Sequence, residues 1–440
     1  MTRIRTPKQN GRAKASSWYG YYAGYSTSFI EDVLEDLALP PGAKILDPWN
    51  GSGTTTTLAS RKGFVAIGFD VNPVLVVVSK ARLLGSEIVS SLPTLTDEIL
   101  SRVHSRNGQL HLSEHDPLCR WFSNQSASWL RALERGIYHV LVGLPDLPDV
   151  AERVSLKPIS DLAAFYYVVL FKVVRRNLRK FTTSNPTWIK TAKIPQQRLT
   201  LSPRVLDNEF QETQQELAKL LCASGPSGPV GWRGRAWIEV ANSRELPIPD
   251  RHVDAVVSSP PYCTRIDYAI ATLPELSVLG FSQPEFIDQL RYRTLGSPLT
   301  SKDVLSADAN WGPTCLEFLD RVAAHSSKAS KTYYHRHYSQ YFAGLYRSLA
   351  EIQRTLREGS HCALVVQDSF YKEIRNDLPR IVCEMVVSLG WRLEDRLDFP
   401  VRLTKAAIHK ESRRYRSDFS ATESLLIFST PEQREPSWRQ

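Results

Sequence analysis

The stretch Lys44-Ile45-Leu46-Asp47-Pro48-Trp49-Asn50-Gly51-Ser52-Gly53-Thr54-Thr55 decides the fold of this 440-residue chain. Its first four residues predict a short strand, a glycine-rich turn follows, and residues 54–62 are expected to form a helix. Residues 65–70 predict a second strand, and residues 74–82 a second helix after the stop at Asn72-Pro73. This order is a βαβ unit, which predicts a doubly wound, Rossmann-like α/β sheet.

An acid opens the glycine-rich turn and indicates the class of ligand. Gly51 and Gly53 let the backbone approach a ligand closely at the carboxyl end of the first strand. The turn lacks the Gly-Lys-Ser/Thr of a phosphate-binding loop and the Gly-x-Gly-x-x-Gly of a dinucleotide site. The carboxylate of Asp47 would repel a pyrophosphate but suits the ammonium and sulfonium of S-adenosylmethionine (SAM). We therefore expect SAM as the cofactor.

A second acid, Asp70, ends the second strand, where it can accept hydrogen bonds from both hydroxyls of a ribose. Alone, either acid can equally be a helix cap or a solvated strand end. Two acids at successive strand ends, with the glycine turn between them, favour a ligand site. Asn72, two residues after Asp70, is assigned to the same site.

The tetrapeptide Ser259-Pro260-Pro261-Tyr262 follows a predicted strand at residues 253–257. Both prolines must leave the sheet, and they form a rigid ledge rich in carbonyl groups. The Pro260 carbonyl and the Ser259 side chain can accept the two hydrogens of an exocyclic base amine and direct its lone pair toward a methyl sulfonium. Tyr262 is expected to stack on a base flipped out of its helix.

Two other interpretations apply to this segment. An isolated Pro-Pro-Tyr is more simply a turn that ends a strand, but its position downstream of a SAM-type loop favours the catalytic one. The Cys263 thiol introduces a rival chemistry, attack on the base ring that directs methylation to carbon. The intervening Tyr262 disfavours it.

Composition limits the partners. The net charge of +9 and pI near 9.2 suit a polyanion. Six cysteines without CxxC spacing predict neither a metal site nor a disulfide framework, and they fit a reducing cytoplasm. We expect no membrane span, because no apolar run reaches about 18 residues.

These residues resemble the DNA amino-methyltransferases, which make N4-methylcytosine or N6-methyladenine. The stretch from Asp47 to Thr55 is similar to their SAM motif, and Ser259-Pro260-Pro261-Tyr262 to their catalytic motif. The segment from Trp18 to Ser26, with Phe29, is similar to the motif that closes over the methionine end of SAM. Asn242 lies at their adenine-contacting turn, where an acid is more usual. Cofactor contacts are therefore assigned to Tyr25, Ser26, Phe29, Asp47, Pro48, Asn50, Gly51, Gly53, Thr54, Thr55, Asp70, Asn72 and Asn242.

The resemblance implies a SAM-dependent enzyme of host DNA modification or defence that acts on flipped bases of duplex DNA, with cognate restriction or defence proteins as partners. A serine at the start of the catalytic motif points to cytosine N4, whereas aspartate or asparagine would point to adenine N6. The alternatives are an adenine-N6 enzyme, an RNA methyltransferase such as one acting on guanine N2 of tRNA, and a catalytically silent SAM-binding module.

Helical segments at residues 121–134, 162–180 and 205–221 interrupt the α/β rhythm. Strands are expected again at 236–240, 253–257, 362–367, 392–398 and 424–428, and helices at 338–356 and 378–389. The expected divisions are a basic flexible tail (1–15), the SAM-binding part of a methyltransferase domain (16–85), a helical insertion suited to target recognition (86–232), the catalytic part (233–273), a turn-rich second insertion (274–332), the remainder of the domain (333–430) and a tail (431–440).

Basic clusters are the predicted nucleic-acid contacts, because lysine and arginine neutralise phosphates. Each cluster can equally be a solvated face, and the Arg265–Asp267 pair can orient a base or cap the next helix. The residues assigned are Arg175, Arg176, Arg179 and Lys180 in the insertion, Arg265 beside the catalytic motif, and Arg413 and Arg414 in a late loop.

Overall fold

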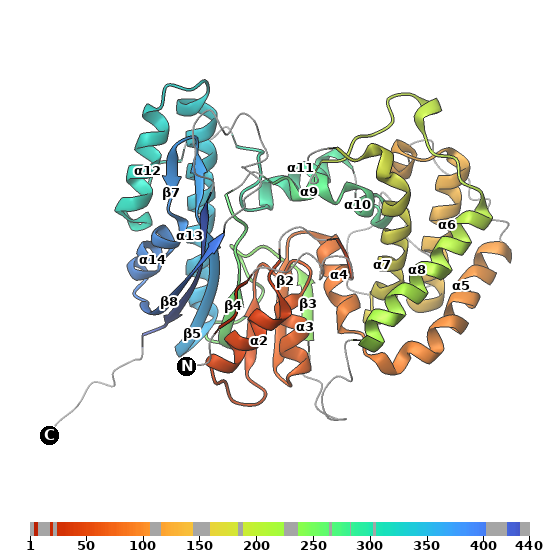
Figure 1. Ribbon diagram of the computed structural model, residues 1–440, viewed down its shortest axis with the longest axis horizontal. Helices are drawn as coiled ribbons and strands as arrows, with labels where there is room; N and C mark the ends of the chain where they lie inside the picture. Colours follow the sequence, from red (N-terminus) through yellow and green to blue (C-terminus); the bar gives the residue numbers. More distant parts are fainter. Residues whose placement is uncertain are drawn as a thin grey trace.

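The computed structural model contains a seven-stranded sheet with helices on both faces (Figure 1). It describes residues 4–7, 18–20, 24–105, 116–143, 159–183, 188–223, 236–263, 266–281, 283–301, 305–401 and 420–431. Neighbouring strands are parallel except β9, which runs antiparallel to both β5 and β8. The doubly wound α/β architecture is confirmed. In spatial order the strands are β3 (Ala236–Val240), β2 (Val65–Asp70), β1 (Lys44–Asp47), β4 (Val253–Ser258), β5 (Leu356–Gln367), β9 (Ala421–Ser429) and β8 (Arg392–Val401).

The sheet changes its winding direction between β1 and β4. Strands β2 and β3 lie on one side of β1, whereas β5 follows β4 on the other side. Open α/β sheets bind their ligands at such a switch point, beyond the carboxyl ends of the strands. Ile45 pairs with Ala255 and Leu46 with Val256, so the ends of β1 and β4 lie side by side.

Apolar side chains alternate between the two faces of the central strands, because a strand has a side-chain period of two. Ile45 and Val257 pack in one buried cluster with Phe29, whereas Leu46 and Val256 pack in another with Leu345. The first cluster involves α2 (Thr27–Asp36) and α3 (Thr54–Arg61), and α4 (Pro73–Leu83) lies beside α3. The second involves α12 (Pro313–Ala324), α13 (His335–Thr355) and α14 (Leu378–Ser388).

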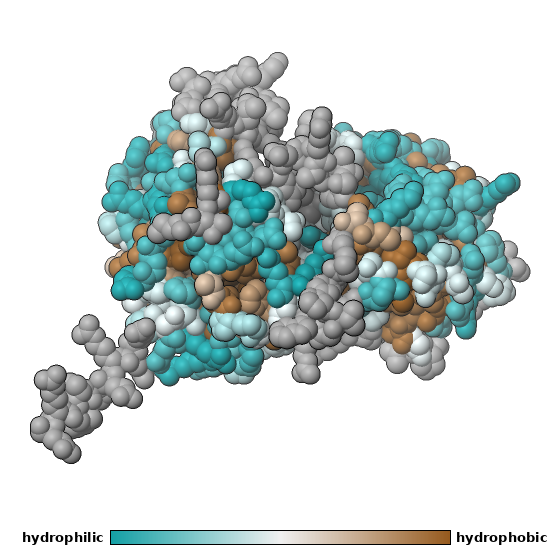
Figure 2. All heavy atoms as spheres, turned by 60° about the horizontal axis from the view of Figure 1, so that its bottom comes forward, coloured by the Kyte–Doolittle hydropathy of each residue, from teal (hydrophilic) through white to brown (hydrophobic). Residues whose placement is uncertain are grey.

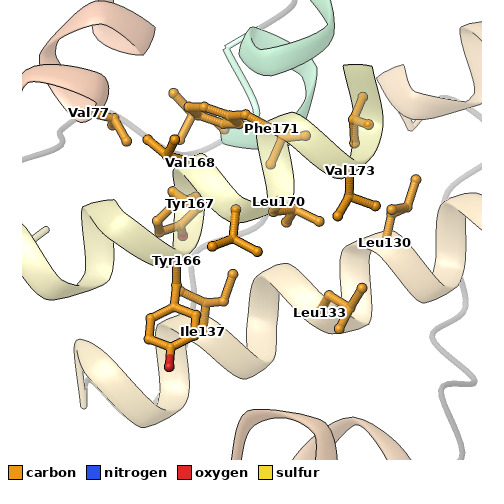
Figure 3. Packing of buried hydrophobic residues seen from close by; sticks show 14 of the residues in the cluster. Val77, Leu130, Leu133, Ile137, Tyr166, Tyr167, Val168, Leu170, Phe171 and Val173 are labelled. Atoms are coloured by element: carbon orange, nitrogen blue, oxygen red, sulfur yellow. The ribbon is translucent and has the colours of Figure 1, made fainter. Parts of the chain in front are cut away.

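The insertion is helical, as expected, and its buried cluster includes helix α4 of the α/β part. Its long helices are α5 (Leu92–Ser105), α6 (Asn124–Leu141), α7 (Asp161–Asn177) and α8 (Pro203–Ala223). Val77 of α4 packs in the same buried cluster as Leu170 of α7 and Leu133 of α6 (Figure 3). The insertion therefore packs directly on the α/β part, through α4.

The second insertion differs from the turn-rich segment that the sequence suggested. It contains α10 (Leu273–Leu279), α11 (Pro284–Arg293) and α12. A proline occupies the first or second position of each helix, where its missing N–H costs nothing. Prolines that resemble turn signals in the sequence therefore begin helices. The segment also divides between two packing partners, because α10 contacts α7 and α4 whereas α12 contacts α13 and α14.

The remaining elements are short. Helix α9 (Tyr268–Ala271) precedes α10, and β6 (Ser369–Tyr371) pairs with β7 (Ile374–Asn376). Short 3-10 segments span Ser86–Ser91, Pro117–Arg120, Leu178–Phe181, Pro195–Gln197 and Ala309–Trp311, and a π-helical turn, Ser330–Tyr334, leads into α13.

Hydrophilic residues prevail on the face drawn in Figure 2, where apolar residues form separate patches. Large exposed apolar side chains come from different elements, for example Val240 of β3, Tyr292 of α11 and Val387 of α14. Within the described ranges, no helix is long and apolar enough to cross a membrane.

Candidate active site

Asp47 lies at the end of β1 and joins the glycine-rich loop to the segment after β4. Its side chain is 1% exposed, and its carboxylate accepts hydrogen bonds from the Ser258 hydroxyl at 2.5 Å, the Trp49 amide at 3.2 Å and the Tyr25 phenol at 3.3 Å. Burial raises the pKa of Asp47 to about 6, although these three donors oppose the shift. A carboxylate in this state gains from a cationic ligand, which would favour its charged form.

The glycine-rich loop is held open by backbone conformation and by buried polar side chains. Gly51 and Gly53 have φ of 51° and 78°, in the region that favours glycine. A Cβ on Gly53 would lie 2.3 Å from the Ser79 hydroxyl, so the position also requires the missing side chain. Asn50 donates to Ser79 Oγ at 2.7 Å and accepts from Thr56 at 2.8 Å. The side chain of Asn50 therefore shapes the loop.

Arg82, which sequence reasoning did not assign to the site, binds the backbone of the glycine-rich loop. Arg82 of α4 donates to the Ser52 carbonyl at 2.7 Å and lies 3.3 Å from the Ser52 and Thr54 hydroxyls. Burial lowers the pKa of Arg82 to about 10. Sequence reasoning missed this role, because arginine side chains in proteins are mostly exposed to water.

Asp70 ends β2, and its carboxylate binds one backbone amide of the glycine-rich loop and one of the segment before α4. Its two carboxylate oxygens accept from the Gly51 amide at 3.0 Å and the Asn72 amide at 2.8 Å. Burial raises the pKa of Asp70 to about 7, with the Asp47 charge as a smaller cause. Each oxygen keeps a second lone pair, so the side chain can still receive a ligand hydroxyl.

Four further predicted cofactor residues have structural contacts of their own. Asn72 caps α4 through the Val74 amide and donates to the Thr272 hydroxyl at 2.8 Å. Ser26 caps α2, and Phe29 is fully buried in the core. The carbonyl oxygen of the Asn242 side chain accepts from the backbone amide and the side chain of Arg244, at 3.1 and 3.2 Å. These contacts account for the four side chains without a ligand, and their assignment to the cofactor stays a prediction.

The aromatic segment before α2 divides between two places. Tyr25 reaches Asp47 and also contacts the Thr55 hydroxyl. Trp18 packs edge-on against Phe165 of α7, and Tyr19 lies against the Glu275–Arg175 ion pair. Residues 21–23 lie outside the described ranges. Within the described part of this segment, Tyr25 is thus the aromatic residue that the structure brings to Asp47.

The tetrapeptide predicted to be catalytic follows the end of β4, as expected, and is held by three elements. Ser259 Oγ donates to the Val365 carbonyl of β5 at 2.8 Å. The Pro261 carbonyl accepts from the Tyr341 phenol of α13 at 3.0 Å. The Tyr262 phenol donates to Glu423 of β9 at 2.9 Å. Ser259 and Tyr262 are half-buried, so both remain reachable from outside.

Ser258, Glu423 and Tyr341 are site residues that sequence reasoning missed. Ser258 lies one residue beyond the strand predicted at residues 253–257, yet its hydroxyl donates to Asp47 and so links β4 to β1. Glu423 follows Tyr262 by 161 residues, and no local pattern marks it. Cys263 is buried, and its thiol lies 3.6 Å from His337 Nε2.

The predicted nucleic-acid contacts have different environments. Arg175 forms an ion pair with Glu275, whose side chain is fully buried, and also donates to the Ala271 carbonyl. Arg176 pairs with Glu216 at 3.0 Å, whereas Arg179 and Lys180 are exposed. Arg175 is therefore committed to an internal contact, and Arg179 and Lys180 keep the exposure that a phosphate contact requires. Arg265, Arg413 and Arg414 lie outside the described residues.

Among the described residues, no group of three or more His, Cys, Asp or Glu side chains could hold a metal ion. The candidate site instead offers a buried acid at the end of β1, a partly buried acid at the end of β2, a loop with two left-handed glycines, and a serine and carbonyl ledge beside them.

No protein-family model matches the chain. It is 24% identical to the Type II methyltransferase M.BsoBI of Geobacillus stearothermophilus over 67% of its own length, and the match spans 58% of that relative. It is 22% identical to the Type II methyltransferase M.AvaI of Nostoc sp. (strain PCC 7120), over 87% of this chain and 80% of that one. A methyltransferase of Anabaena variabilis, also M.AvaI, matches equally.

Solved structures align with the chain only distantly. A SAM-dependent methyltransferase of Methanosarcina mazei aligns over 91% of this chain and 98% of its own, with a TM-score of 0.31 and 9% identity. The rRNA methyltransferase AviRa of Streptomyces viridochromogenes gives a TM-score of 0.27 at 11% identity, with 92% and 86% covered. The similarity on which we rely is therefore the one in sequence, to Type II methyltransferases.

Proposed function

We propose that the chain is a SAM-dependent DNA methyltransferase that acts on the exocyclic amino group of a flipped base. The amino group that we propose is N4 of cytosine. The observation that carries the proposal is the 2.5 Å hydrogen bond between Ser258 and Asp47. It brings the predicted cofactor loop and the predicted amine-binding segment to one point, at the switch point of the sheet. The similarity to Type II methyltransferases supports the same activity and a role in DNA modification or defence.

The residues at the end of β1 and β2 fit SAM by their chemistry. Asp47 is a buried carboxylate suited to an ammonium group, and Asp70 has lone pairs for ribose hydroxyls. Phosphate would meet two carboxylates here and no lysine in the loop. When bound, SAM would supply an electrophilic methyl group. The protein's own contribution is to orient the acceptor amine.

The tetrapeptide can bind an amine through hydrogen-bond acceptors. Ser259 has given its single hydrogen to the Val365 carbonyl, so its remaining lone pairs are available to an N–H donor. The Pro260 carbonyl is a second acceptor on the same ledge. An amine that gives both hydrogens to these acceptors has its lone pair turned away from the ring, which makes it a better nucleophile. Tyr262 would stack on the base and keep it in this orientation.

The experiment is transfer of labelled methyl groups from SAM to duplex DNA, single-stranded DNA and transfer RNA. We expect label on duplex DNA as N4-methylcytosine, reduced transfer by Ser259→Ala, and nearly complete loss in Asp47→Ala and Tyr262→Ala. Label in N6-methyladenine would correct the base, and label only in RNA would refute the DNA substrate. Tight SAM binding without transfer to any nucleic acid would indicate a silent SAM-binding module.

A further inference from the structure

Glu423 is an acid at the catalytic edge of the sheet that the mechanism above leaves without a role. In the antiparallel pair β5 and β9, Gln367 is opposite Glu423. The first residues of β9 therefore lie at the carboxyl end of β5, the same edge at which β1 and β4 end. Glu423 is 9% exposed and accepts the Tyr262 phenol at 2.9 Å.

The hydroxyl hydrogens of Ser259 and Tyr262 are each donated to a different acceptor. Ser259 has one hydrogen, which goes to the Val365 carbonyl at 2.8 Å. Tyr262 has one hydrogen, which goes to Glu423. The two hydroxyl oxygens are themselves 3.4 Å apart. With both hydrogens directed elsewhere, neither oxygen donates strongly to the other, and Ser259 keeps its lone pairs for a ligand.

We propose that Glu423 is a positioning residue that, by accepting the Tyr262 hydrogen, keeps Ser259 Oγ an acceptor for the target amine. This inference rests on the proposed function. Without Glu423, the Tyr262 phenol can turn its hydrogen to the Ser259 oxygen, which lies within reach. The phenol hydrogen would then occupy one of the two lone pairs of Ser259 Oγ and compete with the amine for that oxygen. The same arrangement selects an amino group over a carbonyl group on the base, because a carbonyl has no hydrogen to give.

A double-mutant cycle tests the coupling, because it separates an effect through Tyr262 from any other effect of Glu423. Glu423→Ala should lower kcat at least about tenfold, while the dissociation constant of SAM changes less than about twofold. Tyr262→Phe keeps the ring but removes the competing hydrogen. In that background, Glu423→Ala should cost less than about twofold more, so the double variant should be more active than Glu423→Ala alone.

Matched controls remove the ambiguity of a folding defect. Glu394 is an exposed acid at the opposite end of the β8–β9 pair, bound to Arg392 and Ser429, and Glu394→Ala should leave kcat unchanged. Glu423→Gln retains an acceptor oxygen and should recover part of the activity. An equal loss from Glu423→Ala with Tyr or Phe at position 262, or weakened SAM binding that accounts for the loss, would overturn the proposal.

A readout without substrate separates this inference from the proposed function. In a crystal structure of Glu423→Ala, the Tyr262 phenol should lie within about 3.0 Å of Ser259 Oγ. A phenol that stays at its present distance or moves away would refute the mechanism even if the wild-type protein methylates DNA. Absence of methyl transfer by the wild type, with the phenol moved as expected, would count against the proposed function alone.

Discussion

At the scale of single residues, Asp47 has a structural role in the carboxylate that we propose binds the cofactor. It accepts hydrogen bonds from the cofactor loop, from the strand end before the catalytic motif and from the segment before α2. Its burial nevertheless raises its pKa to about 6, so in the ligand-free protein its charge is costly. A bound cation would remove that cost, which makes the affinity of the site depend on pH.

We expect SAM to bind more tightly as pH rises from 5 to 7. An acid whose pKa is raised in the free protein is protonated below that pKa, and it must lose the proton before it can pair with an ammonium group. Affinity should therefore fall about tenfold per pH unit below pH 6 and level off above pH 7. Calorimetry in buffers of different ionisation enthalpy should detect proton release near pH 6. Asp47→Asn should bind weakly with no such dependence; an unchanged pH profile in that variant would assign the proton elsewhere, with Asp70 the next residue to test.

The site residues that the sequence identified are placed by the local strand pattern, whereas those that it missed are placed by contacts between distant parts of the chain. Asp47 ends β1 and Ser259 directly follows the adjacent strand β4, so a βαβ pattern and a resumed strand were enough to predict that they lie at one edge of the sheet. Glu423 and Arg82 act through contacts with residues 161 and 30 positions away, which depend on strand order and helix packing. Asn50 and Asn72 have the expected positions, but their side chains bind the protein itself.

At the scale of elements, the helix after the catalytic motif is held by two arginines of the insertion. Arg131 donates to the carbonyls of Ser277 and Val278 at the end of α10, at 3.0 and 2.7 Å. Arg175 binds Glu275 in the same helix. Two helices of the insertion, α6 and α7, therefore fix the segment that continues from the catalytic loop. A basic pattern on α7 resembled a phosphate-binding face because the sequence does not reveal that Glu275 is its partner.

Arg175→Ala should destabilise the protein without a specific effect on DNA contact. Removing the cation leaves the Glu275 carboxylate buried and unpaired, which costs about 3–5 kcal/mol. Thermal unfolding should show a clear fall in Tm, whereas Arg176→Ala, which breaks a more exposed pair with Glu216, should change Tm little. If Arg175→Ala instead keeps Tm and reduces the salt dependence of DNA binding by about one unit, Arg175 contacts a phosphate.

At the scale of the whole molecule, helix α4 belongs to two structures at once. It begins directly after its capping residue Asn72, close to Asp70 in the sequence. Its Arg82 binds the backbone of the glycine-rich loop. Its apolar residues, Val74, Val77 and Val78 among them, lie in the buried cluster of the helical insertion. The insertion helices thus bury the apolar side chains of α4. The boundary near residue 86 marks a change of pattern in the sequence, but α4 before it and α6 and α7 after it pack in one cluster.

This shared core predicts that the chain unfolds in a single transition. Two regions with separate cores can melt independently, whereas regions that bury one continuous cluster lose it together. We expect the calorimetric and van 't Hoff enthalpies to agree, and we expect Val77→Ala in α4 and Leu170→Ala in α7 each to lower the same Tm, because each fully buried side chain leaves a cavity. A Val387→Ala variant, exposed on α14, is the control and should have little effect on Tm. Two resolved transitions, with Val77→Ala shifting one and Leu170→Ala the other, would mean that the insertion is an independent domain.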